Sequence, residues 1–175
     1  MSLNFRDLDA HTRRLMLEEI EADIASGSIH ASNYLNDKGA KDWPNLLKSA
    51  ANGHDDAWLA VQLRGGDRLK SECQRRKPHG GYTTVQVPVT APDTLSEGEF
   101  NRYYIRALCR RAIDNKISCV TVYRARASEN PRPESEALIG HGVDAVNLLA
   151  DLRANPGVEA ALGLAKPNSG LSVTL

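Results

Sequence analysis

The chain has 175 residues, of which 41% are hydrophobic and 25% are charged, a composition that indicates a folded globular protein rather than a disordered one. No apolar run approaches the roughly 20 residues of a membrane-spanning helix, and the N-terminus lacks the charged-then-apolar order of a signal peptide. The formal net charge is zero, whereas nucleic-acid-binding proteins are usually basic. We therefore expect one compact domain in a cytoplasmic protein, or in a virion component if the chain comes from a phage.

The charges are distributed unevenly along the chain. Residues 64–132 contain fourteen Lys and Arg against seven Asp and Glu, and the remaining residues contain eight against fifteen. A basic middle segment of this kind can bind an anion, or it can pair with the acidic flanks of its own chain or of a second copy. Eleven of the fourteen cations are arginines, which suit bidentate contacts with carboxylates as well as with phosphates.

Residues 1–66 are predicted to form a helical region that starts with an amphipathic helix. Asp7 or Asp9 can cap this helix, and Ser26-Gly27 supplies the left-handed residue that commonly ends one. Its acidic residues gather toward the C-terminal end, where the helix dipole disfavours them. A cationic surface nearby would offset that cost.

A short helical hairpin is predicted over residues 42–64. Its first helix begins at Asp42-Trp43-Pro44, because proline suits the first turn of a helix, and its second helix is capped by Asp55. Trp43 and Trp58 are the expected packing anchors of this hairpin.

Residues 67–81 are predicted to be a basic loop or arm. This stretch contains Arg75, Arg76 and Lys77, and Pro78 and the Gly80-Gly81 pair break regular structure. It has too little apolar content to fold alone, so we expect it to be exposed.

A strand is predicted over residues 82–90, a long helix from Thr94 to Asn115, and a second strand over residues 116–126. Thr94 stands three residues before Glu97, as in a capping box. The roughly 20-residue crossover suits parallel pairing of the two strands in one sheet covered by the helix. The order arm, strand, long helix, strand is similar to that of tailed-phage capsid proteins, a similarity of topology with no shared motif.

The C-terminal part is predicted to contain a rigid extended linker at residues 130–133, a helix over residues 143–154, a further turn within residues 157–164 and a short strand at residues 171–175. The expected fold class is therefore α+β, or a small α/β layer. Residues 82–175 would form its α/β core with a C-terminal helix and tail.

Arginines recur at a helical spacing within the basic middle segment. They are four residues apart on the long helix and therefore share a face, while Phe100, Tyr104, Leu108 and Ala112 lie on another face and are predicted to be buried. Strand alternation adds two arginines from the second strand. If these side chains converge with the arm, they form one basic surface that suits phosphates. The candidate interface or anion-binding residues are Arg75, Arg76, Lys77, Arg102, Arg106, Arg110, Arg124 and Arg126.

Two acidic groups could serve acid–base chemistry, but the sequence assigns no catalytic residue. His54-Asp55-Asp56 stands where helix-capping groups belong, and that interpretation is favoured. Glu134 and Glu136 flank Ser135, and nothing in one loop separates the roles of acid and base. Whether His54, Glu134 or Glu136 has a catalytic role stays open.

No metal or cofactor is expected. The five histidines are scattered, and no two have the short helical spacing of a metal pair. Cys73, Cys109 and Cys119 lack a C-x-x-C spacing, so we interpret them as reduced thiols, two of them buried.

Three classes of function remain open. We favour a non-enzymatic, self-assembling structural protein, either an oligomer, a shell or a virion component. In it the acidic flanks of one copy dock on the basic middle of another, and the arm reaches a neighbour. The first alternative is a nucleic-acid-binding protein that contacts phosphates through the same arginines. The second is an enzyme that uses them as a clamp for an anionic substrate. No membrane partner is expected.

Overall fold

The computed structural model describes residues 2–128, 130–157, 162, 164 and 169–175. Over these residues the chain forms six helices and two small sheets, which confirms the predicted α+β fold. The helices are α1 (Ala10–Ser26), α2 (Asp37–Gly53), α3 (Asp56–Gly65), α4 (Ala91–Asp114), α5 (Pro133–Leu138) and α6 (Ala145–Ala154). The strands are β1 (Glu72–Arg76), β2 (Tyr82–Gln86), β3 (Cys119–Arg124), β4 (Gly142–Asp144) and β5 (Leu171–Thr174).

The ends of α1 and α3 are set by the capping residues predicted from the sequence. The Asp9 carboxylate accepts a hydrogen bond from the Thr12 amide, and Gly27 ends α1 at a φ of 69°. In the same way, the Asp55 side chain accepts from the Trp58 amide at the start of α3. Both predictions are confirmed.

The predicted start of α2 at Asp42-Trp43-Pro44 is wrong. The helix begins at Asp37, because the Asn36 side chain accepts a hydrogen bond from the Gly39 amide and caps it there. Pro44 therefore lies inside the helix. Trp43 is fully buried, and Trp58 is half-buried.

The capping box predicted at Thr94 is also wrong, although the helix itself is confirmed. α4 begins one turn earlier, after Thr90, whose side chain forms no capping hydrogen bond. Pro92 in the first turn favours this earlier start. The end at Asn115 is as predicted.

The strands before and after α4 do not pair with each other, so the predicted parallel sheet is wrong. β2 pairs antiparallel with β1, and the predicted loop at residues 67–81 thus contains a strand. β3 lies between β4 and β5, both antiparallel to it. A hairpin partner across a short turn forms without a crossover connection, which explains why β2 takes β1. Of the similarity to capsid proteins, only the order of elements remains.

The C-terminal part contains two elements that were not predicted. Pro133 begins the short helix α5 rather than ending a rigid linker, and residues 142–144 form β4 ahead of α6. The α6 helix and the terminal strand β5 confirm their predictions. The further turn expected within residues 157–164 lies largely outside the described residues.

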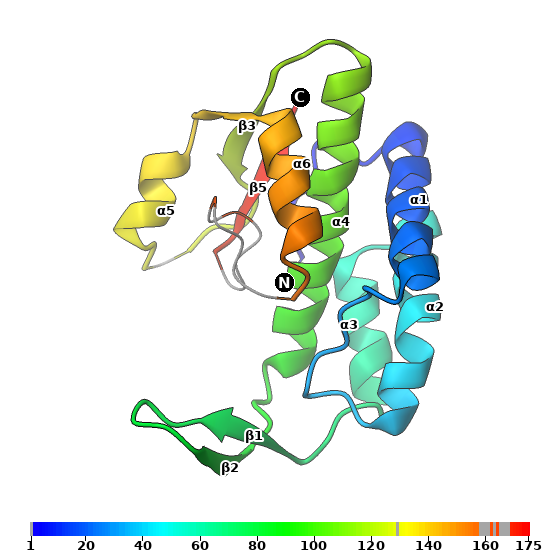
Figure 1. The fold of residues 1–175 in the computed structure, drawn as a ribbon, viewed down its shortest axis with the longest axis vertical. Coiled ribbons are helices and arrows are strands. Elements are labelled where there is room, and N and C mark those ends of the chain that lie inside the picture. The colour runs from blue at the N-terminus through cyan, green and yellow to red at the C-terminus, as the bar shows by residue number, and fades with distance from the viewer. Residues whose placement is uncertain (1, 129, 158–161, 163, 165–168) are drawn as a thin grey trace.

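The helix α4 is the centre of the core. Figure 1 shows it between α1 and α6, and α3 packs on it as well. Its predicted core residues Phe100, Tyr104, Leu108 and Ala112 are all at most 1% exposed. One buried cluster extends from Leu15 of α1 to Val173 of β5, so the helical region and the three-stranded sheet share a core. In the described part of the chain, no helix is both long and apolar enough to span a membrane.

Candidate interaction surface

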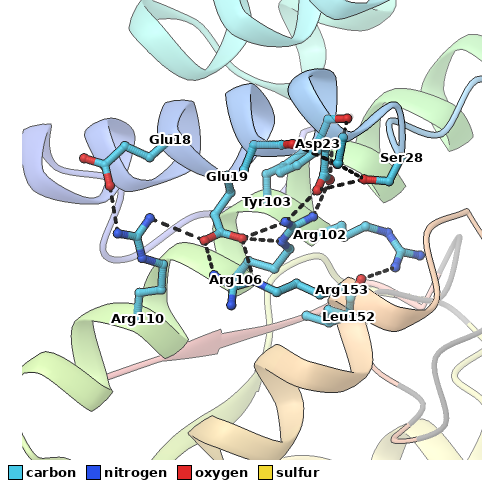
Figure 2. Close-up of polar contacts among 12 residues, drawn as sticks. Glu18, Glu19, Asp23, Ser28, Arg102, Tyr103, Arg106, Arg110, Leu152 and Arg153 are labelled. Atoms are coloured by element: carbon cyan, nitrogen blue, oxygen red, sulfur yellow. Dashed lines mark hydrogen bonds and ion pairs between the residues drawn. The ribbon is translucent and has the colours of Figure 1, made fainter.

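The arginines of α4 meet the acidic residues of α1 in the same chain (Figure 2). The Arg106 guanidinium lies 2.6 Å from a carboxylate oxygen of Glu19 and 2.6 Å from one of Asp23. The side chains of Arg106 and Glu19 are only 2% and 3% exposed. Arg106 is therefore part of the core and is not available to a phosphate in solution.

Three arginines converge on Glu19. Arg106 and Arg153 both donate to it, and Arg110 lies 3.3 Å away while also bonding Glu18 at 2.7 Å. Burial alone would raise the pKa of Glu19, but the hydrogen bond from Arg153 and the charge of Arg106 outweigh it, so the pKa lies below its ordinary value. Glu19 is thus an ionised buried carboxylate that joins α1, α4 and α6.

Arg102, which shares this face of α4 with Arg106 and Arg110, joins α4 to the C-terminal end of α6. It donates to the carbonyl of Asn155 at 2.8 Å and to that of Leu152 at 3.4 Å, which suits a cation at a helix C-terminus. It also lies 4.0 Å from Glu99, and burial raises the pKa of Glu99 to about 7 while Arg102 opposes that rise.

Arg124 at the end of β3 and Arg126 just after it also have partners within the chain. Arg126 lies 3.1 Å from Glu97 of α4, and Arg124 pairs with Glu136 of α5 and donates to the carbonyl of Ser169. One of the two carboxylates considered for catalysis, Glu136, is therefore engaged in an ion pair.

Two further members of this network, Arg111 and Arg153, were not singled out from the sequence. Arg111 lies 2.9 Å from Asp9 and also donates to Thr12, and Arg153 binds Glu19 across 134 positions of sequence. No local spacing marks such a contact, because both partners look like ordinary surface charges on their own helices.

Among the predicted candidates, only Arg75, Arg76 and Lys77 remain open to solvent. They belong to the hairpin of β1 and β2, residues 72–86, which we call the β1–β2 arm from here on. Arg75, Arg76 and Lys77 are all exposed, and no ion pair involves them within the described residues. Figure 1 shows the arm extending away from the helices. Of its residues, Cys73 is the one buried side chain, at 8% exposure.

A groove of about 400 Å³ runs between the arm and the loop before α2. Arg75 and Arg76 line it together with Asn33, Tyr34 and Cys73. On β2, Tyr82 stands opposite Arg76 in the pairing register and is 68% exposed. The arm thus combines exposed cations with an exposed aromatic ring.

The His54-Asp55-Asp56 cluster is largely structural. Asp55 caps α3, His54 stacks on Trp58 with ring centroids 4.3 Å apart, and the buried Asp56 accepts from the Ser2 hydroxyl and the Leu3 amide. Burial raises the pKa of Asp56, with the hydrogen bonds opposing that rise.

The structure does not bring the other acidic candidates to this cluster. Glu134 and Glu136 belong to α5, which lies on the far side of α4 from α3 in Figure 1. Over the described part of the chain, no group of three or more His, Cys, Asp and Glu side chains could hold a metal ion. Cys73 and Cys109 are buried and Cys119 is exposed, so two of the three thiols are buried, the number predicted from the sequence.

Comparison with known proteins leaves the assignment to the geometry. No protein-family model, curated protein or solved structure matches the chain.

Proposed function

We propose that the chain is a non-enzymatic, self-assembling protein whose β1–β2 arm is the contact surface between copies. The observation that carries the proposal is the contrast between the arm, residues 72–86, and the rest of the described chain, which we call the body. The body cations Arg106, Arg110, Arg124 and Arg126 have carboxylate partners in their own chain, whereas those of the arm are exposed. A protruding two-stranded hairpin is marginal by itself, so a partner would stabilise it.

This proposal differs from the sequence-based hypothesis in the residues that join the copies. The sequence suggested that the acidic helix of one copy docks on the basic middle of another. Glu19 and Asp23 of α1 instead bind Arg106 of the same chain, so the proposal places the contact between copies on the arm.

The test is to remove the arm without disturbing the body. The Val87 amide donates to the Ser71 carbonyl at 2.9 Å, the bond that closes a two-residue hairpin loop. Replacing residues 72–86 by Asn-Gly should therefore join Ser71 to Val87 in a type I′ turn. No arm residue belongs to the main buried cluster, so the body should keep its cooperative unfolding.

The measured quantity is the mass in solution by light scattering. We expect the full chain to associate and the shortened chain to be a monomer with an unchanged unfolding transition. Equal association of the two proteins would overturn the role of the arm.

A second candidate function is nucleic-acid binding by the same arm. The observation in its favour is that the exposed Tyr82 lies beside Arg76, an arrangement that suits stacking on a base next to a phosphate contact. The test is binding of a labelled single-stranded oligonucleotide. The logarithm of its binding constant should fall linearly with the logarithm of the salt concentration. Replacing Arg75, Arg76 and Lys77 together by Glu should then abolish binding, and no binding by the unaltered chain would exclude this function.

A further inference from the structure

The hydrogen-bond register of the arm shows which backbone groups point outward. The amide of Lys77 donates to the Gly81 carbonyl, and that of Val87 to the Ser71 carbonyl, so odd-numbered residues bond across the hairpin. The amides and carbonyls of the even-numbered residues therefore point away from the partner strand. On β2 these residues are Tyr82, Thr84 and Gln86, and all three are exposed.

The two outer edges of the arm differ in one contact. On the β1 side, the Gln74 carbonyl is the one outward backbone group that has a hydrogen-bond partner among the described residues, the side chain of Asn33. Residues 34–36 pair with residues 68–70 just before the strand. On the β2 side, the described residues provide no hydrogen-bond partner for the outward amides and carbonyls of Tyr82, Thr84 and Gln86.

The sequence of β2 does not protect this open edge. Exposed edge strands are usually protected by charges, proline or a bulge against pairing with another strand. The stretch Tyr82-Thr83-Thr84-Val85-Gln86-Val87 contains no charge and no proline, whereas β1 contains Glu72, Arg75 and Arg76. The β2 edge is thus the uncharged one of the two, and it is rich in residues that favour strands.

We propose that β2 pairs antiparallel with β2 of a second copy about a two-fold axis at Thr84, which joins the two arms into a four-stranded sheet. This inference rests on the proposed function and names its contact. Because the outward groups belong to residues 82, 84 and 86, Thr84 lies opposite Thr84 of the second copy, and Tyr82 lies opposite Gln86.

The side chains along this edge fit a second copy as the occupant, because no like charges meet there. Each cross-strand neighbour in this register is uncharged: Tyr82 with Gln86, Thr83 with Val85, and Thr84 with itself. Threonine pairs and pairs of β-branched residues stabilise adjacent strands. The two-fold axis also sends the cationic tips to opposite ends of the joint sheet, so like charges do not face each other.

A matched pair of proline variants tests this edge. Thr84→Pro removes an outward amide on β2 and Gln74→Pro removes one on β1, so neither breaks a backbone bond within the hairpin. Both variants also lose the same side-chain hydrogen bond, from Gln74 to the Thr84 hydroxyl. They differ in which edge they block.

We expect sedimentation velocity over a concentration series to show association of the unaltered chain and of Gln74→Pro. Thr84→Pro should associate at least about tenfold more weakly, since two symmetry-related hydrogen bonds are lost. Equal association of all three proteins, or equal weakening by both variants, would overturn edge pairing while leaving self-assembly in place. A monomeric unaltered chain would overturn both.

A cross-link gives an independent readout. In a chain that carries Cys119→Ser, Thr84→Cys places two thiols at the two-fold axis, and oxidation should give a covalent dimer. Gln74→Cys in the same background should give none. A dimer from Gln74→Cys but not from Thr84→Cys would contradict the proposed register.

Discussion

Arg106 of α4 and Glu19 of α1 form an ion pair in the protein core, 2.6 Å apart and with side chains 2% and 3% exposed. The pair joins the acidic flank of the sequence to its basic middle within one chain. Arg110 and Arg153 complete the surroundings of Glu19, so its charge is compensated from three sides. The charge segregation along the sequence therefore serves, at this point, to fix α1 on α4.

Neutralising Glu19 should destabilise the fold strongly. Glu19→Gln leaves Arg106 with one of its two carboxylate partners, and breaking a buried pair costs about 3–5 kcal/mol in the free energy of unfolding. The matched control is Glu18→Gln one position away, where the side chain is 46% exposed and a change within about 1 kcal/mol is expected. Urea denaturation of both variants at pH 7 measures the difference, and equal losses would refute the core role of Glu19.

The effect of Glu19 should also depend on pH. Its pKa is lower in the folded protein than its ordinary value of 4.5, so the unfolded chain binds the proton more readily. The stability it contributes is present above pH 4.5 and is lost as pH falls through the folded pKa. We expect the gap in unfolding free energy between the unaltered chain and Glu19→Gln to be constant near neutral pH and to shrink in acid. A difference in unfolding free energy that grows in acid would contradict a lowered pKa of Glu19 in the folded protein.

Glu99 should show the opposite dependence. Burial raises its pKa from 4.5 to about 7, so the folded protein holds the proton more tightly than the unfolded chain. The associated stability is complete below pH 4.5 and is lost as pH rises through 7. At pH 8, the free energy of unfolding of Glu99→Gln should exceed that of the unaltered chain by up to about 3 kcal/mol. Arg102 keeps its bonds to the end of α6 in this variant. At pH 4 the difference should vanish, and a gain of the same size at both pH values would exclude the mechanism.

Two helical glycines should respond oppositely to alanine. A Cβ at Gly39 would lie 2.1 Å from the Arg68 carbonyl oxygen, because the start of α2 packs directly on the segment that leads into the arm. Gly39→Ala should therefore destabilise the protein by at least about 1 kcal/mol. At Gly98 of α4 nothing lies within 4 Å, so Gly98→Ala should stabilise it by about 0.5–1 kcal/mol. Thermal unfolding distinguishes the two, and a stabilising Gly39→Ala would contradict the close packing at the arm's base.

The sequence predicts those features that depend on neighbouring residues. Asp9, Gly27 and Asp55 act on helix ends within four positions, and all three are found where their chemistry places them. Asn36 could have been identified as a cap by the same rule, but Pro44 is a stronger local signal and gave a start that is too late.

Features that join distant segments could not be predicted in the same way. The pairing of β3 with β5 and the contact of Arg106 with Glu19 depend on how the helices pack, and no spacing in the sequence encodes them. The same limit applies to the candidate surface: helical spacing showed that Arg102, Arg106 and Arg110 share a face of α4, but not that α1 and α6 cover it.

The central claim, that the arm joins copies of this chain, is tested most directly by the absolute mass of the unaltered protein. Light scattering behind a sizing column, with absorbance recorded at 260 and 280 nm on the same peak, gives both mass and nucleic-acid content. We expect a nucleic-acid-free particle of at least twice the 19.1 kDa chain mass. A 19.1 kDa monomer at every concentration would contradict the claim, and excess absorbance at 260 nm on that monomer would favour nucleic-acid binding instead.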